Sequence, residues 1–462
     1  MHRSLSFLAL LVAGCPKPAP HVAPVPLPQA SPGTTIAGAP PSAEQLEEEE
    51  APASLRGLPE PALKWQVEVG HTTYRTTLLA QGGRIILGSN GREWHAATDP
   101  LDGVWVLAGP DGRQLAHLMP PGGDEKDVNG VAVDGDALIF GTDQGVVYKS
   151  TFGGQVLWQA NIGGDAEAAP GLYDANGDGV LDVAIGAEEG SFFVLDGRSG
   201  ETLFMIPSSR GDYGQVGFVA PPALYDANGD GVRDVFAPGR DNWLHAVDGR
   251  TGKPLWSNQH QSGLHGAPIV TDTDRDGRPE LIYTEAYSDL HAVDPSSGQQ
   301  RWGASLEHPS MGIEGLFSPV TWHPQLGCAL LGTAWWQEQE GLYCVGPQGM
   351  LWRWTEPTGN ITSGAVVGDV DGRPGLEVVF GTESGRLLAL DMAGQPVWAV
   401  AIGAPIECTP TLADIDGDGL TEVLVAANDG FLRAYETPGR APAALGYHRG
   451  DVYNQGTLFV EP

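Results

Sequence analysis

The sequence predicts an all-β fold, a β-propeller of about eight four-stranded blades that follows a disordered N-terminal tether. After Leu63 a unit of roughly 45 to 50 residues recurs, which is the signature of a propeller or a solenoid. Each unit contains short apolar or alternating runs separated by glycine-containing turns, as antiparallel strands do. The 65 glycines and 37 prolines also favour strands and turns over helices. Closing such units into a ring leaves only short, protected sheet edges, with seven blades as the alternative count.

Residues 1–14 have the features of a secretory signal peptide. Arg3 gives a basic start, and the apolar run at residues 5–12 is too short to span a bilayer. The segment VAGC, residues 12–15, resembles the bacterial lipobox, in which the cysteine, here Cys15, becomes the lipidated first residue. The resemblance implies a lipid-anchored protein of the bacterial cell envelope, at the outer membrane, whose only membrane contact is the lipid. The alternative is an ordinary signal peptide with an incidental cysteine.

The composition changes between residues 15 and 62. The stretch PKPAPHVAPVPLPQASPG is rich in proline, and LEEEEAP adds a run of charge. Neither stretch can bury a core, so we expect a disordered tether that ends where the propeller, residues 63–462, begins.

Five copies of the repeat begin with an acidic loop, and three weaker copies lack it. The acidic copies begin at Asp174, Asp226, Asp272, Asp369 and Asp414; the weaker ones begin at Gly82, Gly135 and Leu326. Residues 63–70, LKWQVEVG, resemble the end of a unit without its beginning, and the last copy lacks that strand. We therefore expect the N-terminal strand to complete the final blade and close the ring.

Four of the acidic loops have the composition of calcium sites. Calcium needs about six to eight hard oxygen ligands on a backbone that can curl around the ion. An EF-hand is excluded because Ile185 stands at the twelfth position of the first loop, where a glutamate is required. The alternative is a metal-free turn, since Asp, Asn and Gly favour turns. The expected ligands are the side chains at positions 1, 3, 5 and 9 and the carbonyl at position 7: Asp174, Asn176, Asp178, Val180, Asp182; Asp226, Asn228, Asp230, Val232, Asp234; Asp272, Asp274, Asp276, Arg278, Glu280; and Asp414, Asp416, Asp418, Leu420, Glu422.

These four loops predict about four structural calcium ions, because each packs several like charges into one tight turn. The loop from Asp369 departs from the pattern, since Arg373 and Pro374 replace Asp and Gly. There we expect the guanidinium to substitute for the ion and no metal to bind.

The acidic loop followed by an apolar strand resembles FG-GAP or VCBS-type repeats, as in integrin-like propellers. The segment AVDGRTGKPLW, residues 246–256, resembles the repeat of PQQ-type quinoprotein propellers. Both resemblances imply a propeller but leave the activity open, because propellers include enzymes and binding proteins. Several quinoprotein dehydrogenases place a disulfide of adjacent cysteines against the quinone, and this chain has no such pair. PQQ is therefore not the expected cofactor.

Residues seven positions before the first loop aspartate should line the mouth of the central channel. Glu167, His265 and Glu407 hold this position in three copies. Two carboxylates and a histidine could bind a cation or a sugar, or act as acid and base. The alternative is a solvated rim with no ligand.

Tryptophans and cysteines supply the remaining signals. Trp158, Trp256, Trp302 and Trp398 recur at the ends of repeats and should pack between blades, whereas Trp335 and Trp336 at a hairpin tip could pack in the core or contact a partner. Cys328 and Cys344 lie at equal distances from the middle of that hairpin and should form a disulfide worth roughly 3 kcal/mol. Cys408 should be a buried apolar residue.

The charge balance limits the partners. With 25 Lys plus Arg against 58 Asp plus Glu, the net charge of −33 disfavours nucleic acid. The leading interpretation is a calcium-stabilised, lipid-anchored scaffold without catalysis, which binds a protein or glycan in the periplasm or at the cell surface. The alternatives are a PQQ-dependent dehydrogenase and a carbohydrate-binding or carbohydrate-degrading surface protein.

Overall fold

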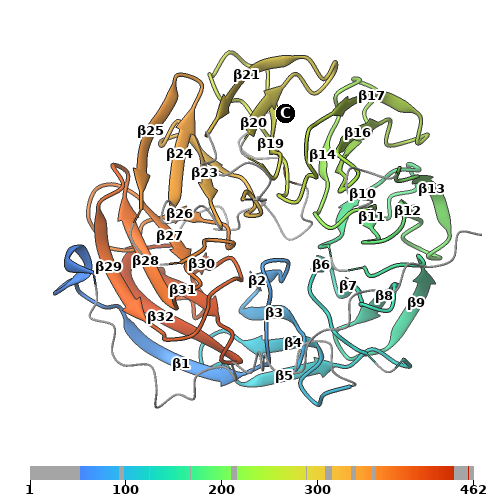
Figure 1. Cartoon of the computed structure of the whole chain (residues 1–462). Helices are drawn as coiled ribbons and strands as arrows, with labels where there is room; N and C mark the ends of the chain where they lie inside the picture. Colours follow the sequence, from blue (N-terminus) through green and yellow to red (C-terminus); the bar gives the residue numbers. More distant parts are fainter. Residues whose placement is uncertain are drawn as a thin grey trace, which may run out of the picture. The chain divides into compact units, whose positions relative to one another are not determined.

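The described residues form a ring of eight four-stranded antiparallel sheets (Figure 1). The computed structural model describes residues 52–92, 98–123, 125–166, 168–209, 216–287, 289–306, 315–334, 340–355, 359–441 and 456. The predicted all-β propeller and its eight blades are confirmed, and the alternative of seven is wrong. Among the described residues, no helix has the length and apolarity needed to cross a membrane.

Seven blades are built from four consecutive strands each. Blades 1 to 4 consist of β2 (Leu78–Gln81), β3 (Arg84–Ser89), β4 (Gly103–Ala108), β5 (Gln114–Leu118); β6 (Val131–Asp134), β7 (Ala137–Gly141), β8 (Val146–Thr151), β9 (Val156–Asn161); β10 (Gly171–Tyr173), β11 (Asp182–Gly186), β12 (Phe192–Leu195), β13 (Thr202–Ile206); and β14 (Ala223–Tyr225), β15 (Asp234–Pro238), β16 (Trp243–Val247), β17 (Pro254–Gln259). Blades 5 to 7 consist of β18 (Ile269–Thr271), β19 (Glu280–Thr284), β20 (Asp289–Val293), β21 (Gln300–Ser305); β22 (Thr321–His323), β23 (Cys328–Gly332), β24 (Leu342–Gly346), β25 (Gly349–Trp354); and β26 (Val366–Gly368), β27 (Glu377–Gly381), β28 (Arg386–Asp391), β29 (Pro396–Ala401).

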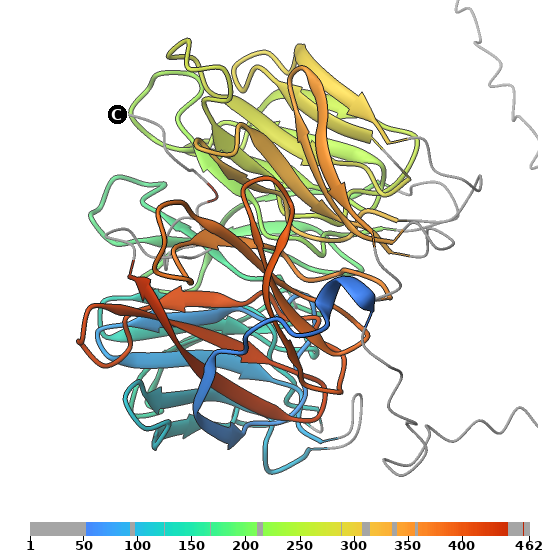
Figure 2. The ribbon, with the colours of Figure 1, turned by 90° about the vertical axis from the view of Figure 1, so that its left-hand side faces the viewer.

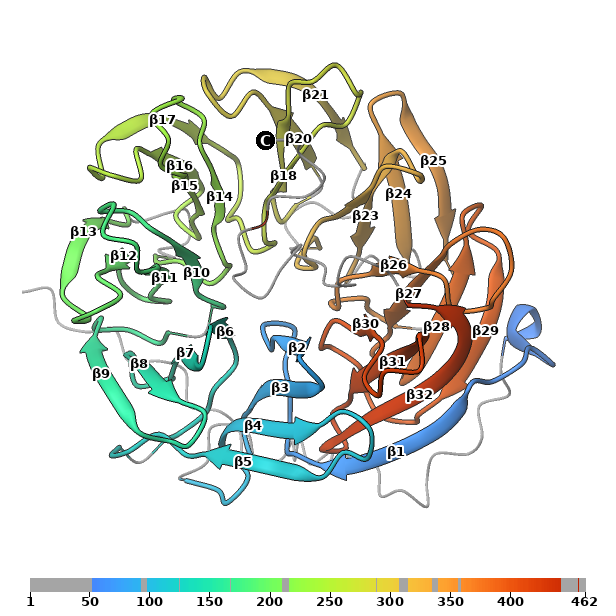
Figure 3. The same cartoon turned by 180° about the vertical axis from the view of Figure 1, so that it is seen from behind.

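Blade 8 joins the two ends of the propeller. It contains β30 (Thr411–Ala413), β31 (Leu420–Ala426), β32 (Phe431–Arg440) and β1 (Ala62–Glu68), in the order β1-β32-β31-β30. β1 runs antiparallel to β32, so the N-terminal strand supplies the outer strand that the last repeat lacks (Figures 1 and 3). The predicted closure of the ring is therefore confirmed.

The hydrophobic core lies between neighbouring blades. First strands of adjacent blades contact one another around the axis, as β10 does with β6 and β14. Second strands such as β11 and β19 are buried at every position, because neighbouring blades cover both of their faces. Fourth strands such as β9 lie on the perimeter of the ring and alternate between exposed and half-buried or buried residues. Figure 2 shows β1, in blue, in this outer position on blade 8. Burial thus decreases from the axis outward, and the strand sequences become less apolar in the same direction.

An indole hydrogen bond links several blades to the next. Trp158 on β9 donates its Nε1–H to the carbonyl of Gly197, in the turn between β12 and β13, at 2.9 Å. Gly200 lies against the same ring with φ +76°, and a Cβ there would lie 2.8 Å from the indole. The turn therefore needs glycine for both conformation and space. The same bond recurs elsewhere: Trp65 to Gly109, Trp256 to Pro295 and Trp352 to Met392, at 2.9, 2.8 and 3.1 Å.

Trp302 and Trp398 also pack between blades, as predicted, but they make other contacts than this hydrogen bond. Trp302 donates to the hydroxyl of Thr273 in its own blade at 3.0 Å, and its ring lies 6.4 Å from that of Trp322 in blade 6. Trp398 is buried in the apolar cluster that blade 7 shares with blade 8. Trp335 and Trp336 lie outside the described residues.

The described chain begins before the predicted propeller boundary at residue 63. A short 3-10 helix, η1 (Ala53–Leu55), precedes β1, and Leu55 is only 6% exposed in an apolar cluster shared with blades 6 and 7. Pro59 accepts a hydrogen bond from the backbone of Ala399. Residues 52–61 thus cover the outside of these blades. Residues 1–51, including Cys15, lie outside the described residues.

Cys328 of β23 and Cys344 of β24 form a disulfide within blade 6. The sequence places the two cysteines directly opposite each other, but that register is wrong, because Cys344 pairs with Leu330 and the bridge is diagonal. Both side chains point to the same face of the sheet, so the diagonal still allows a Cα separation of 5.4 Å. Cys408 is fully buried, and burial together with Glu407 raises its pKa to about 12.

Replacing Trp65 with alanine should loosen the closure of the ring. The change removes the indole that joins β1 to blade 1, and we expect it to lower the free energy of unfolding by on the order of 3 kcal/mol. Trp65→Phe keeps most of the apolar area and should cost about 1 kcal/mol for the lost hydrogen bond. Urea unfolding of both variants measures this. An unchanged midpoint for Trp65→Ala would show that β1 is not needed for closure.

Candidate functional site

Because each blade is an antiparallel meander, the connections between its strands lie alternately on the two faces of the ring. Connections between first and second strands share one face with those between third and fourth strands; we call this the loop face. Segments entering the first strands share the other face with the connections between second and third strands; we call this the rim face. The predicted metal loops therefore lie on the opposite face of the propeller from His265 and Glu407, which stand before the first strands of their blades.

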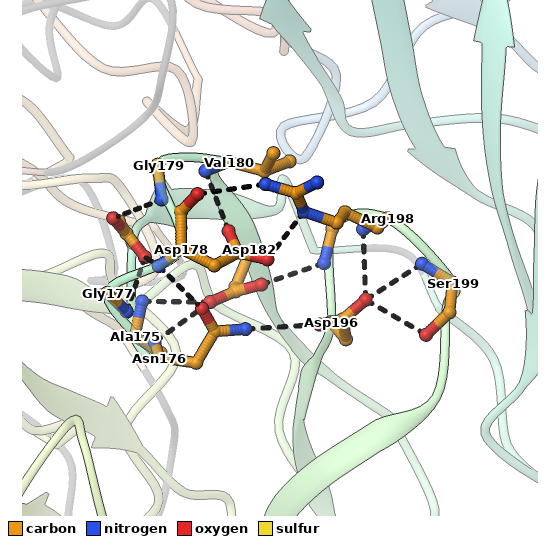
Figure 4. A network of polar contacts seen from close by, with 12 residues as sticks. Ala175, Asn176, Gly177, Asp178, Gly179, Val180, Asp182, Asp196, Arg198 and Ser199 are labelled. Atoms are coloured by element: carbon orange, nitrogen blue, oxygen red, sulfur yellow. Dashed lines mark hydrogen bonds and ion pairs between the residues drawn. The ribbon is translucent and has the colours of Figure 1, made fainter.

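The first acidic loop, residues 174–182, turns its side-chain oxygens onto its own backbone (Figure 4). Asp174 accepts the N–H group of the residue five positions later at 2.9 Å. The side chains at the third and fifth positions accept N–H groups two residues further on. Asp182 closes the loop by accepting from Ala175 at 2.8 Å and from Gly197 at 2.7 Å. The loop is thus held as a tight turn with its oxygens on one side.

The other acidic loops repeat this arrangement. In each of them the ninth residue, or its equivalent in the loop from Asp369, accepts a backbone N–H from the second residue. An ionised carboxylate can accept about four hydrogen bonds, so these contacts leave lone pairs free for a hard cation. Three sets of carboxylates have oxygens within 4.8 Å of one another: Asp272, Asp274, Asp276; Asp369, Asp371, Glu377; and Asp414, Asp416, Glu422.

The loop from Asp369 has this gathering of carboxylates although the sequence predicts no metal there. Arg373 lies 3.7 Å from Asp371, but its side chain is 79% exposed. The guanidinium thus stands beside the carboxylates on the solvent side, and the absence of metal from this loop stays a prediction.

A basic side chain stands beside each of the four loops with predicted metal, and sequence reasoning missed it. Arg198 contacts Asp178 at 2.5 Å. The equivalent Arg250 lies 3.8 Å from Asp230, and Arg301 pairs with Glu280. The motif DGR at residues 196–198 and 248–250, in the turn between the third and fourth strands of blades 3 and 4, could have signalled the first two. In blade 8 the partner comes from β1: Lys64 lies 2.7 Å from Asp416 and 3.3 Å from Glu422.

The carboxylates at the ninth position are buried. Asp182, Asp234 and Glu422 are each 0% exposed. Burial raises the pKa of all three above the ordinary value, to about 6 for Asp234, although backbone hydrogen bonds oppose the shift. A bound cation would favour the ionised form and offset this cost of burial. The loops therefore have both the ligand type and the electrostatic need for a divalent ion.

The predicted channel-mouth residues have different neighbours on the rim face. His265 is 7% exposed and lies 4.8 Å from the ring of Phe317; burial, with the charges of Arg240 and Arg75, lowers its pKa to about 3. A neutral, buried imidazole is not a solvated rim group. Glu407 accepts a hydrogen bond from Asn428 at 3.0 Å, and burial together with Glu383 raises its pKa. Glu167 lies outside the described residues.

An ion-pair bridge connects three blades near His265. Glu188, between β11 and β12, accepts from Arg75 at 3.0 Å and from Arg240 at 2.5 Å. Beside it, Tyr74, His265 and Phe317 line a cavity of about 30 Å³, which has room for a few water molecules. The cavity that the described residues line is too small for a three-ring quinone.

Sequence reasoning missed an acidic cluster on the rim face of blade 2. Glu125, Asp127 and Asp143 have carboxylate oxygens within 4.8 Å of one another, and Asp143 is 6% exposed. Burial, then Asp127, Asp165 and Glu125, raises the pKa of Asp143 to about 8, although Arg75 opposes the shift. Such a group can hold shared protons or a cation. Asp127 stands seven residues before Asp134, so the spacing used for Glu167 could have found it in this weaker copy.

The fold is an eight-bladed propeller, and part of its repeat region matches a known family. Residues 183–321 match the family model PQQ_2, described as outer membrane protein assembly factor BamB. No curated protein matches the chain. The resemblance to FG-GAP and VCBS repeats remains a prediction.

Solved structures share the fold at low sequence identity. BamB from Moraxella catarrhalis is 16% identical, with 82% of this chain and 100% of that chain covered and a TM-score of 0.56. Quinohemoprotein alcohol dehydrogenase ADHIIG from Pseudomonas putida HK5 is 14% identical, with 84% and 78% covered and a TM-score of 0.60. The computationally designed Ika8 protein is 16% identical, with 81% and 99% covered and a TM-score of 0.56. At such identities the likeness shows the fold alone.

The acidic cluster predicts a pH dependence of stability in EDTA. The raised pKa of Asp143 means that the folded state keeps a proton which the unfolded chain has lost, so stability should fall as pH rises from about 4 to about 8. In Asp143→Asn this slope should be shallower, and the variant should gain on the order of 2 kcal/mol relative to wild type between those limits. Thermal unfolding across this range tests it.

The exposed Asp136→Asn in the same blade is the control and should keep the wild-type slope. Equal slopes in wild type and Asp143→Asn would contradict the assignment.

Proposed function

We propose that this chain is a calcium-stabilised, lipid-anchored propeller of the bacterial cell envelope that acts as a non-catalytic scaffold for a protein partner. The observation that carries the proposal is the match of residues 183–321 to a family described as an outer membrane protein assembly factor. The apolar segment ending in Cys15 and the proline-rich tether support export and attachment to a membrane.

Calcium is the ion that the four loops fit best. Every predicted ligand is an oxygen, and the loops offer up to four side chains and a carbonyl each. The basic partners, such as Arg198 and Lys64, offset only one charge per loop, so several negative charges remain. No position in this set calls for chemistry, and the ion would pin the first two strands of its blade. A structural role follows.

Binding without catalysis is favoured by the rim face. The cavity beside His265 has a volume of about 30 Å³, and the ion pairs of Glu188 cross the space next to it. A PQQ-dependent dehydrogenase needs a pocket for the quinone, and the cavity beside His265 is smaller than that. Glycan binding rests on Trp335 and Trp336, which lie outside the described residues, so it remains an alternative for experiment.

The perimeter of the ring is the candidate partner surface. The exposed large apolar side chains among the described residues lie on fourth strands or directly after one, and they include Leu157 on β9 and Leu203 and Met205 on β13. Fourth strands are also sheet edges, with backbone groups that a partner strand can pair. Blades 2 and 3 therefore present neighbouring apolar edges suited to a protein.

Removal of calcium should lower the thermal stability of the protein, and added calcium should restore it. Asp230→Ala should lower the measured stoichiometry by about one ion, because it removes one side-chain ligand and leaves the other loops intact. Asp371→Ala, in the loop predicted to lack metal, is the matched control and should leave the stoichiometry unchanged. Equilibrium dialysis with elemental analysis measures both. A wild-type protein that holds no calcium would end the structural-ion proposal.

A photo-crosslinking amino acid at Met205 should capture a protein partner in the native envelope. We expect a discrete adduct that mass spectrometry identifies as an envelope protein, with a weaker yield when Leu157 carries a lysine. The same amino acid at exposed Arg250 on the loop face serves as the control and should give no such adduct. Adducts of equal yield at both positions would contradict a perimeter interface, and PQQ-dependent dye reduction would contradict the absence of catalysis.

A further inference from the structure

We propose that His260, Glu285 and His291 form a binding site for a zinc-type divalent metal on the rim face, between blades 4 and 5. His260 directly follows β17, Glu285 directly follows β19, and His291 lies within β20. The three residues therefore come from the outer strand of one blade and the inner strands of the next. None of them belongs to the acidic loops or to the channel-mouth residues described above.

The three ligand atoms converge. Nδ1 of His260 lies 3.9 Å from Oε2 of Glu285, Nε2 of His291 lies 3.9 Å from Oε1 of the same carboxylate, and all three ligand atoms lie within 4.8 Å of one another. Ligands about 2.0–2.2 Å from a tetrahedral zinc are roughly 3.4 Å apart. The separations of 3.9 Å, and of up to 4.8 Å, exceed that spacing by about 0.5 to 1.4 Å, so side-chain rotations of this size would close the site around an ion.

Surrounding groups hold the candidate ligands in place. Tyr283 hydrogen-bonds Nε2 of His260 at 3.2 Å, which leaves Nδ1 as the nitrogen that faces Glu285. The ring of Tyr283 also stacks on His291 with a centroid distance of 5.1 Å. Oε2 of Glu285 accepts the N–H of Gln261 at 3.0 Å. Oriented imidazoles and a hydrogen-bonded carboxylate are the outer-shell features of protein metal sites.

The charge states suit a metal. Burial and the neighbouring His291 lower the pKa of His260, so its imidazole is neutral at pH 7 and can donate a lone pair. Burial opposes ionisation of Glu285, but its contacts with His291 and Asp289 and the hydrogen bond from the Gln261 backbone outweigh it and lower its pKa. Glu285 is therefore an anion. The side chains of Glu285 and His260 are only 5% and 8% exposed, so the negative charge sits where water provides little screening.

The donor set selects the class of metal. Two imidazole nitrogens and one carboxylate are ligands for zinc and related transition metals, whereas calcium prefers oxygen alone. Three protein ligands leave a fourth position open for water or for a group on a partner. The rim-face site thus differs in chemistry as well as in position from the loops of the opposite face.

The neighbouring blade provides a built-in comparison. His245 of β16 occupies in blade 4 the strand position that His291 occupies in blade 5. Its Nε2 faces Asp241 at 3.4 Å, and it belongs to none of the groups of three or more close potential ligands among the described residues. The repeat alone therefore does not create the site; the arrival of His260 from the preceding blade does.

The test is calorimetric titration of Zn²⁺ into chelator-treated full-length protein in excess Ca²⁺, with Co²⁺ as a spectroscopic probe. We expect about one Zn²⁺ to bind and Co²⁺ to give the visible absorption of a low-coordinate site. His260→Gln and His291→Gln should each weaken Zn²⁺ binding at least tenfold and remove that absorption. His245→Gln is the matched control and should change neither. Circular dichroism verifies that each variant is folded.

Any of the following outcomes would overturn the site. These are no Zn²⁺ binding by the wild type, unchanged binding by the folded double variant His260→Gln/His291→Gln, and an equal loss in His245→Gln. Retention of Zn²⁺ by the two single variants at full affinity would also assign the ion elsewhere. Because calcium is present in excess throughout, a negative result for the zinc site would not count against the calcium loops.

Discussion

The ring depends on a recurrent contact in which an indole on the outer strand of one blade donates its N–H to a carbonyl in the next blade's last turn. Trp65, Trp158, Trp256 and Trp352 make it. The contact buries a large aromatic area and satisfies the indole donor at the same time, so it fixes the spacing and the angle between blades. At the interface between blades 8 and 1, which closes the ring, the indole comes from β1. The N-terminal strand therefore makes the same contact that joins other neighbouring blades.

The second constraint is electrostatic. The whole chain carries a net charge of −33, and the two faces of the ring accommodate their acidic groups differently. On the loop face, carboxylates gather in tight turns beside single basic side chains such as Arg198 and Lys64. On the rim face, Glu188 joins two arginines, while Asp143 has its pKa raised among other acids. Loop-face carboxylates thus have the geometry of hard-cation sites, whereas the rim face combines ion pairs, protonated acids and imidazoles.

The fold does not choose between the proteins that share it. A BamB and a quinohemoprotein dehydrogenase both resemble this chain as folds, and neither resemblance places a substrate here. What separates the possibilities is local: the small cavity beside His265, the ion pairs of Glu188 near the axis and the apolar edges at the perimeter. These features are the ones on which the proposed binding role rests. The proposed nitrogen-and-oxygen site between blades 4 and 5 adds metal chemistry that the repeat family does not itself imply.

The sequence by itself determined the propeller fold, a count of about eight blades and closure by residues 63–70, because strands, turns and repeats are local patterns of fixed period; the structure decided between eight blades and seven. It also located the acidic loops, whose candidate ligands lie within nine residues of one another. Only the tertiary structure decided the diagonal register of Cys328 and Cys344, the basic partners of the loops, and the meeting of His260 with Glu285 and His291. These arrangements join residues from different strands or blades, and the packing angle between sheets, which no local pattern encodes, sets which side chains meet.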